Sequence, residues 1–255
     1  MTDRPPLLRH VEHCMGTVFS FDVRSACDPG AFRETLRWLH WVDGTFSTYR
    51  ADSDISRLAN GHTTVSECVP EVGLILDLCA RLNRETGGYF DARAGATLDP
   101  SAVVKGWAVE QAHHQLRAAG STRHCINAGG DIRCIGGRAD GQPWRLGIAD
   151  PFAPGALIAV VEAHDVALAT SGVAERGQHI LDPHTGQPAD ELVSLSVVGA
   201  DLTTVDAVAT AAFAMGSGAR AWIERRGDVS GFGVAANGAT WSTPGFPAAV
   251  PAPAT

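Results

Sequence analysis

The spacing of apolar side chains changes about halfway along the chain, and this change limits the folds that the sequence can adopt. Between residues 30 and 119, apolar side chains recur at the three- and four-residue spacing of a helix, whereas after residue 124 most of them occur in short runs separated by tight turns. Helices are predicted at residues 30–46, 70–86 and 101–119, and strands at residues 16–23, 125–127, 131–135, 144–148, 157–161, 166–169, 192–199 and 231–235. Because helices and strands are grouped and do not strictly alternate, the sequence predicts an α+β fold. We expect mixed or antiparallel sheets with packed helices, and not a doubly wound parallel sheet.

The composition excludes several classes of protein. A formal net charge of −8 argues against nucleic acid as the main partner. No apolar run approaches the roughly 18 residues of a membrane span, so no membrane insertion is expected. The N-terminus lacks an apolar signal core, and the six cysteines have neither C-x-x-C nor zinc spacing, which predicts a cytoplasmic protein with reduced thiols. We expect one domain over residues 1–246 and a disordered Pro/Ala-rich tail over residues 247–255.

An Ala-rich segment that ends at Gly216 predicts a helix with Thr203 or Thr204 as its N-cap. Within this helix, Asp206 and Thr210 lie about one turn apart on the same face. Thr203 and Asp206 could form a capping box, with Thr210 bonding back to a carbonyl. Alternatively, the carboxylate and the hydroxyl are two oxygen ligands for a hard cation such as Mg²⁺. The helix alone leaves both interpretations open.

Two further segments could face an anion. Lys105 begins the motif Lys-Gly-Trp-Ala near a helix N-terminus, where the helix dipole favours anions. It is therefore either a solvated lysine or one aimed at a bound anion. Residues 127–131, Asn-Ala-Gly-Gly-Asp, form either a plain tight turn or a cradle of backbone N–H groups for phosphate. The chain has no G-x-G-x-x-G or Walker sequence, which excludes the ordinary Rossmann and P-loop sites.

The stretch around His179 is the densest polar segment of the chain. Ser171, Arg176, Asp182 and Thr185 lie close to His179 in the sequence. His179 is either a strand-edge histidine or a general base or phosphate partner, because imidazole can accept a proton near neutral pH.

Together these segments resemble one family, the FAD:protein FMN transferases, also called ApbE-like flavin transferases. The resemblance extends from Met15 to Gly216, and its landmarks occur in family order. The landmarks are Ser-Thr-Tyr-Arg at 47–50, Gly-Tyr-Phe-Asp at 88–91, Lys-Gly-Trp-Ala at 105–108, Asn-Ala-Gly-Gly-Asp at 127–131, Thr-Ser-Gly at 170–172 with Arg176, His-Ile-Leu-Asp-Pro at 179–183 with Thr185 and Gly186, and Asp206 with Thr210.

The resemblance implies an enzyme that binds FAD and Mg²⁺ and transfers FMN from FAD to a threonine hydroxyl of an acceptor protein, releasing AMP. It implies that the Ala108 carbonyl, the Asp206 carboxylate and the Thr210 hydroxyl hold the cation, and that His179 and Asp206 are the catalytic residues, with His179 as the base. The residues that fall where the family contacts FAD are Met15, Tyr49, Asp91, Gly95, Lys105, Gln111 and the backbone of Leu181.

The sequence also departs from the family pattern. Many relatives carry a longer insertion between Asp91 and Lys105, which bears on the contact expected at Gly95, and a tyrosine is usual where this chain has Trp107. Two other functions stay open at this point. The same site could hydrolyse FAD to FMN and AMP as a Mg²⁺-dependent pyrophosphatase, or the protein could bind or carry FAD without catalysis.

Overall fold

The computed structural model describes residues 8–95, 97–138, 141–174 and 177–247, and most of the tail predicted at 247–255 lies outside these residues. The fold is α+β, as predicted. The helices are α1 (Pro29–Phe46), α2 (Asp54–Ala59), α3 (Pro70–Glu85), α4 (Ser101–Ala118), α5 (Leu202–Ala214) and α6 (Ala219–Arg226), with short 3₁₀ turns at Val65–Glu67 and Gly216–Gly218. The strands are β1 (Leu8–Cys14), β2 (Thr17–Val23), β3 (His124–Ala128), β4 (Asp131–Ile135), β5 (Trp144–Ala149), β6 (Leu157–Ala163), β7 (Val166–Gly172), β8 (Leu181–Asp182), β9 (Gln187–Pro188), β10 (Leu192–Gly199), β11 (Ser230–Ala235) and β12 (Thr240–Ser242).

One large sheet organises the molecule. Its strands follow the order β1-β2-β3-β4-β7-β10-β11-β12, while β5–β6 and β8–β9 form separate two-stranded hairpins. Every strand pairing among the described residues is antiparallel. Such a sheet needs only short connections, which agrees with the hairpin spacing of the second half of the sequence.

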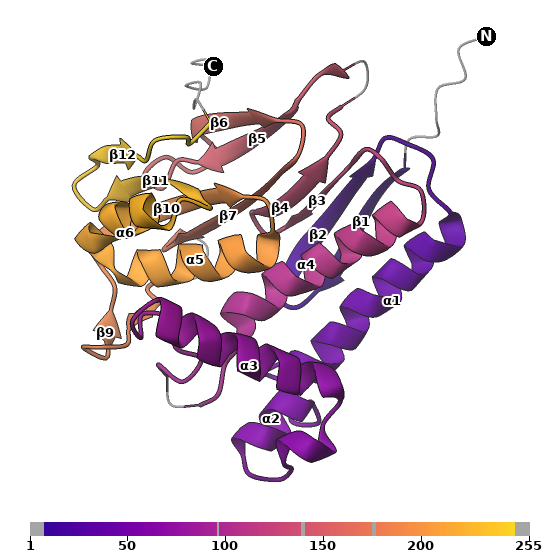
Figure 1. The fold of residues 1–255 in the computed structure, drawn as a ribbon, viewed down its shortest axis with the longest axis horizontal. Coiled ribbons are helices and arrows are strands. Elements are labelled where there is room, and N and C mark those ends of the chain that lie inside the picture. The colour runs from indigo at the N-terminus through magenta and orange to yellow at the C-terminus, as the bar shows by residue number, and fades with distance from the viewer. Residues whose placement is uncertain (1–7, 96, 139–140, 175–176, 248–255) are drawn as a thin grey trace.

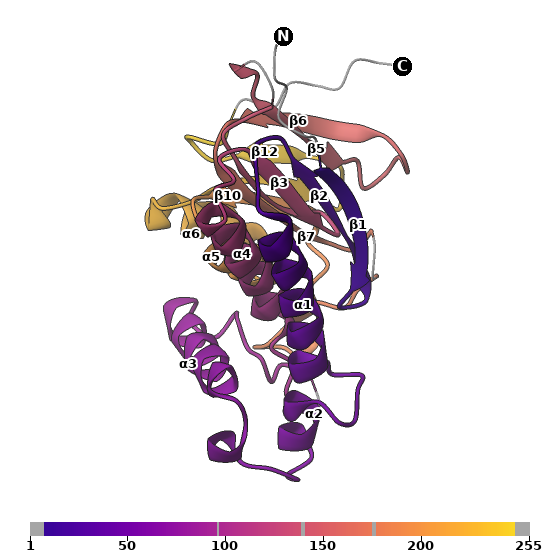
Figure 2. The same ribbon diagram turned by 90° about the vertical axis from the view of Figure 1, so that its right-hand side faces the viewer.

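The two faces of the sheet are covered differently. Figures 1 and 2 show α1, α4, α5 and α6 on one face, with the β5–β6 hairpin on the other. Strand β7 illustrates the division, because its side chains alternate between the faces. Ala167 and Ala169 belong to the core under the helices, whereas Val166 and Leu168 pack in the smaller core under β5–β6. Small residues on the helix side let α5 approach the sheet closely.

The predicted elements are present, but their limits and number differ in places. Strand β1, Leu-Arg-His-Val-Glu-His-Cys, was not predicted, because its many polar side chains obscure the alternation typical of a strand. It is a strand because it pairs with β2. Helix α6 and the short strands β8, β9 and β12 were also not predicted. Strand β7 continues to Gly172, so the Thr-Ser-Gly landmark belongs to a strand.

The N-cap predicted for α5 is wrong. Asp201, and not Thr203 or Thr204, caps the helix, since its side chain accepts a hydrogen bond from the Thr204 backbone N–H at 2.8 Å. The predicted stop is confirmed, because the helix ends at Ala214 and Gly216 adopts a φ of +56°.

None of the helices in the described part of the chain combines the length and the hydrophobicity that a membrane span requires. All six cysteines are free thiols. Cys14, Cys79 and Cys134 are buried and pack as small apolar side chains, and burial raises the pKa of the Cys79 thiol to about 12.

Candidate active site

Lys105 lies in the second turn of α4, near the N-terminus of the helix as predicted. Its ammonium group forms an ion pair with Asp131, at the beginning of β4. The Asp131 side chain is almost fully buried and also accepts a hydrogen bond from the Thr170 backbone N–H of β7, at 3.3 Å. The Lys105 side chain keeps 25% of its surface exposed. Its charge is therefore held at the edge of the protein interior, where an anion could approach.

Asp206 connects α5 to α4. Its side chain is buried, and Oδ2 accepts a hydrogen bond from the Gly106 backbone N–H at 3.0 Å. A Cβ at position 106 would lie 2.6 Å from the Leu202 carbonyl oxygen and 2.8 Å from the Asp206 Cβ, so only glycine permits this approach of the two helices. The carboxylate thus faces α4 and does not form the capping box that Thr203 could have made with it.

Thr210 follows one turn after Asp206 and faces β7. Its hydroxyl lies 3.5 Å from the Ser171 hydroxyl, at the outer limit of a hydrogen bond. Since Ser171 adjoins Thr170, which contacts Asp131, these contacts link α4, β4, β7 and α5 in one place. We call Lys105, Asp131, Ser171, Asp206 and Thr210 the Lys105 cluster.

The glycine turn at residues 127–131 is a plain hairpin turn. The Gly130 N–H donates to the side-chain oxygen of Asn127 at 2.9 Å, and the Gly129 N–H donates to the Val18 carbonyl at 3.2 Å. Both N–H groups therefore have acceptors within the protein. The contribution of this turn to the site is Asp131, which begins the next strand.

Ala108 is fully buried in α4, and its carbonyl accepts a hydrogen bond from the indole N–H of Trp38 at 3.2 Å. This contact comes from α1, whereas Asp206 and Thr210 come from α5. In the structure the Ala108 carbonyl therefore contacts an indole of α1. The other two cation ligands that the family resemblance implies, Asp206 and Thr210, lie on α5.

His179 lies on an exposed segment between β7 and β8. Its Nδ1 is 3.0 Å from the Gly177 carbonyl oxygen. A carbonyl only accepts hydrogen bonds, so Nδ1 is the donor in this contact, which leaves Nε2 to accept a hydrogen bond in the neutral tautomer. Neighbouring Arg176 lies outside the described residues.

The residues expected to contact FAD come from several separate segments of the fold. Met15 has a φ of +50°, unusual for a residue with a side chain, in the tight turn between β1 and β2. Tyr49 is 96% exposed, and Asp91 and Gly95 lie on the exposed connection before α4. The other two, Gln111 on α4 and Leu181 in β8, are half-buried. Tyr49, Asp91 and Gly95 come from connections outside the helices and strands that form the Lys105 cluster.

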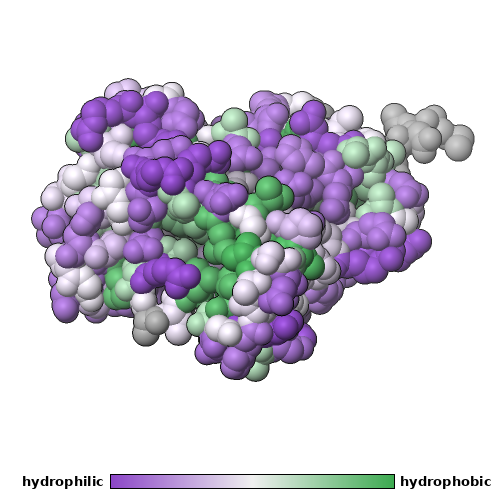
Figure 3. All heavy atoms as spheres, turned by 60° about the horizontal axis from the view of Figure 1, so that its bottom comes forward, coloured by the Kyte–Doolittle hydropathy of each residue, from purple (hydrophilic) through white to green (hydrophobic). Residues whose placement is uncertain are grey.

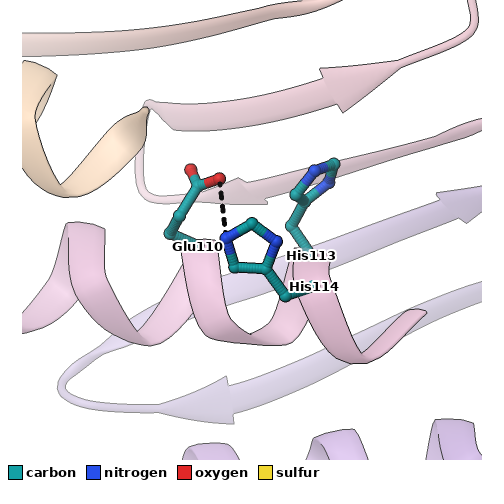
Figure 4. Close-up of side chains that lie close together, drawn as sticks. All are labelled: Glu110, His113 and His114. Carbon is teal, nitrogen blue, oxygen red and sulfur yellow. Dashed lines mark ion pairs between the residues drawn. The ribbon is translucent and has the colours of Figure 1, made fainter. Parts of the chain in front are cut away.

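A second polar cluster lies further along α4 and comprises Glu110, His113, His114, His124 and Arg133, which we call the His113 cluster. Figure 4 shows three of these side chains, with an ion pair between Glu110 and His114. Ligand atoms of Glu110, His113 and His114 lie within 4.8 Å of one another. However, the Arg133 guanidinium lies 3.2 Å from one Glu110 oxygen, and the Leu202 backbone N–H donates to the other at 2.7 Å.

The two buried histidines of this cluster, His113 and His124, are held neutral. His113 Nδ1 lies 2.8 Å from His124 Nε2, and His124 Nδ1 lies 2.9 Å from the Ser121 hydroxyl. Burial, and then the charge of Arg133, lowers the pKa of His113 to about 2 and that of His124 to about 4. Arg133 therefore already supplies the positive charge beside Glu110. Nitrogen ligands also do not suit Mg²⁺, which prefers oxygen.

Two grooves beside α3 contain none of the residues expected in the site. One, of about 410 Å³, lies between α3 and the ends of α5 and α6, and includes Arg81, Thr204 and Arg226. The other, of about 330 Å³, includes Leu74, which is largely exposed, and Trp107. Hydrophobic surface gathers near the middle of the face seen in Figure 3.

Comparison with known proteins decides the family. A model described as the ApbE family matches residues 15–97 and 92–232, most of the chain. The chain belongs to the ApbE family. Among curated ApbE relatives, the FAD:protein FMN transferase of Vibrio cholerae is 27% identical over 268 aligned residues, covering 79% of each chain. The FAD:protein FMN transferase of Haemophilus influenzae is 26% identical and covers 69% of each chain.

Solved ApbE structures share the fold. The flavin transferase ApbE from Vibrio cholerae superimposes with a TM-score of 0.83 at 24% identity, covering 94% of this chain and 98% of that one. The apo form of the Pseudomonas stutzeri flavinyl transferase ApbE gives a TM-score of 0.82 at 22% identity, covering 96% and 97%. At this identity the agreement concerns the fold.

Sequence reasoning on this ApbE-family chain missed three features of the site. It gave no role to Asp131, although the residue stood in a recognised motif. It also missed the contact of Gly106 with Asp206, for which a glycine inside a predicted helix was an available signal. The indole of Trp38 on the Ala108 carbonyl had no local signal, because the two residues are 70 positions apart.

Proposed function

We propose that this protein transfers FMN from FAD to a threonine hydroxyl of an acceptor protein, in a Mg²⁺-dependent reaction that releases AMP. The main support is the contact of Asp206 with Gly106, the residue after Lys105, which holds a buried carboxylate at the meeting point of α4 and α5. Membership of the ApbE family and the names of the curated relatives support the same reaction.

The cation would be held by Asp206 and Thr210. A buried carboxylate and a neighbouring hydroxyl form an all-oxygen donor set, which fits a hard cation such as Mg²⁺. The Ala108 carbonyl is the third ligand in this proposal, and Trp38 would have to share or release it. When bound, Mg²⁺ would neutralise the charge that develops on the phosphate oxygens.

FAD would bind as a substrate across the surface around the Lys105 cluster. Lys105 supplies positive charge for the pyrophosphate, which a chain with a net charge of −8 needs where it binds an anion. The exposed Tyr49 ring is free to pack on an aromatic group. The remaining proposed contacts are Met15, Asp91, Gly95, Gln111 and the backbone of Leu181.

His179 would act as the base. Its Nε2 lone pair accepts the proton of the acceptor threonine as the threonine oxygen attacks the phosphorus on the FMN side. The new threonine O–P bond forms while the bond to the bridging oxygen breaks, and that oxygen leaves with AMP. Asp206 would contribute by positioning the charge-neutralising cation, since its carboxylate is already fixed by Gly106.

We propose a cytoplasmic location and a single domain over residues 1–246. The six free thiols support a reducing compartment. The continuous sheet, whose β1 and β12 lie at opposite edges, supports a single domain. Cell fractionation of the tagged chain tests the location, and a single cooperative unfolding transition tests the domain.

Intact-mass spectrometry of candidate acceptors tests the function. The purified chain is incubated with FAD, Mg²⁺ and proteins that carry an exposed threonine, with EDTA in a parallel sample. The expected result is a mass gain of one FMN unit on an acceptor, equimolar AMP release, and neither in EDTA. Free FMN and AMP without acceptor modification would instead indicate a pyrophosphatase. FAD binding without AMP would indicate a carrier.

A further inference from the structure

His184 joins two loops that come from distant parts of the sequence. Its ring packs edge-on against Tyr89, with the ring centroids 4.5 Å apart and an interplanar angle of 73°. It also lies over Gly88, where an added Cβ would be 3.2 Å from Cε1 of His184. The φ of Gly88 is +92°, which favours glycine at this position. His184 therefore has a close and specific partner surface although it is exposed.

The loop that carries Tyr89 is firmly attached to α3. The Asn83 side chain donates to the Phe90 carbonyl at 2.9 Å, and the Phe90 N–H donates to the Thr86 hydroxyl at 2.9 Å. The Phe90 ring is buried in the main core. Tyr89 is thus held on both sides by residues that cannot move independently of the core.

The hairpin that carries His184 is stiff as well. The His184 N–H donates to the Asp182 side chain at 2.9 Å, and the Gly186 N–H donates to the Asp182 carbonyl at 2.8 Å. At the other end, the Ala189 N–H donates to the Ile180 carbonyl at 2.9 Å. A constraint at His184 is therefore transmitted along the hairpin to Leu181, which lies between Ile180 and Asp182.

We propose that His184 is a positioning residue whose contact with Tyr89 holds the β8–β9 hairpin, and with it the Leu181 backbone and nearby His179, ready for FAD. This inference rests on the proposed function, because Leu181 and His179 face FAD only if that proposal holds. Without the contact, FAD has to fix the position of the hairpin when it binds. The loss then appears in the KM for FAD, while kcat at saturating FAD is retained.

Steady-state kinetics of two variants test this role. His184→Ala is expected to raise the KM for FAD by about three- to tenfold, in line with the contribution of one aromatic pair, and to leave kcat within about twofold. His184→Phe keeps a ring against Tyr89 and is expected to restore the KM. His62→Ala, which removes an exposed loop histidine elsewhere, is the matched control. An unchanged KM in His184→Ala, or a KM in His184→Phe as high as in His184→Ala, would overturn the inference.

A second measurement does not depend on activity. Amide hydrogen exchange at Ala189, whose N–H closes the hairpin, is expected to be faster in His184→Ala than in the wild-type chain and normal in His184→Phe. Equal exchange in His184→Ala and wild type contradicts the inference. If the wild-type chain transfers no FMN, the dissociation constant for FAD replaces KM in the comparison. The proposed function is then overturned while the role of His184 is still decided.

Discussion

Helix α4 contributes to two buried polar clusters that differ in what they can bind. In the Lys105 cluster the ligand atoms beside the lysine are oxygens, and the Lys105 side chain remains 25% exposed. In the His113 cluster, nitrogen atoms predominate and the Arg133 side chain, 7% exposed, occupies the place of a cation beside Glu110. The two clusters lie about a turn and a half apart on one helix.

The difference lies in the charge that the protein itself provides. Glu110, His113 and His114 have the residue types and the proximity of a metal site, yet both Glu110 oxygens already have protein donors. The His113 cluster fixes the N-terminus of α5 to α4, because Glu110 accepts the Leu202 N–H. Asp206 and Thr210 of the Lys105 cluster lie on this same helix α5, so their positions depend on that attachment. Substitutions in the Lys105 cluster should change activity, and substitutions in the His113 cluster should change stability.

The largest effect on activity is expected from His179→Ala. As a general base, His179 should contribute roughly 10²–10⁴-fold to turnover, while the affinity for FAD stays nearly unchanged. Turnover and the FAD dissociation constant are measured on the same preparation. A loss of affinity equal to the loss of rate would make His179 a binding residue.

Arg133→Met should have the largest effect on stability. It removes the guanidinium partner of the buried Glu110 carboxylate, at a cost of about 3–5 kcal/mol in the free energy of unfolding. Urea unfolding measures the cost. FMN transfer per folded molecule, measured well below the melting temperature, should stay near wild type. Full stability with lost transfer would reverse the assignment of the two clusters.

The pH dependence of the free energy of unfolding should show that the buried histidines of the His113 cluster are neutral. His113 and His124 have folded pKa values lowered to about 2 and about 4, below the ordinary value near 6.5 of an unfolded histidine. The unfolded chain therefore binds more protons below pH 6.5. The stability from these groups is complete above that pH and declines as the pH falls toward 4, by about 1.4 kcal/mol per pH unit for each histidine. Urea unfolding at pH 7, 6 and 5 tests this, and a flat profile there would contradict the buried neutral pair.

Thr210→Ala should have the smallest effect. A neutral hydroxyl contributes less than a carboxylate to holding a cation, so the Mg²⁺ concentration for half-maximal activity should rise by roughly two- to tenfold. Thr210→Ser keeps the hydroxyl and is the control. Its contact with Ser171 is long, so little stability should be lost. Equal Mg²⁺ requirements in all three proteins would remove Thr210 from the cation site.

The sequence was informative where local pattern decides structure. It located α1, α3 and α4 to within about two residues, and the antiparallel α+β class followed from hairpin spacing. Strand β1 escaped prediction, because an edge strand with charged side chains lacks an apolar face and depends on its pairing with β2.

The site residues also divide into features that local sequence pattern predicts and features that depend on distant segments. Asp206 and Thr210 were recognisable as polar residues on an apolar helix, and the structure places both at contacts with other elements. Their partners were not predictable, because Gly106 and Ser171 come from segments far away in the sequence. The predicted N-cap of α5 was wrong for a simpler reason. Asp201, Thr203 and Thr204 are all good N-cap residues, and sequence alone does not choose between them.

Calorimetry of Asp206→Asn tests the central claim most directly. The amide oxygen can still accept the Gly106 N–H, so the variant without ligands should melt close to wild type, within about 1 kcal/mol. Mg²⁺ with FAD should stabilise the wild-type chain by about 2.7 kcal/mol at concentrations a hundred times the dissociation constant. In Asp206→Asn the part of this stabilisation that requires Mg²⁺ should be absent. A wild-type Mg²⁺ response in Asp206→Asn would contradict the claim that this carboxylate holds the cation.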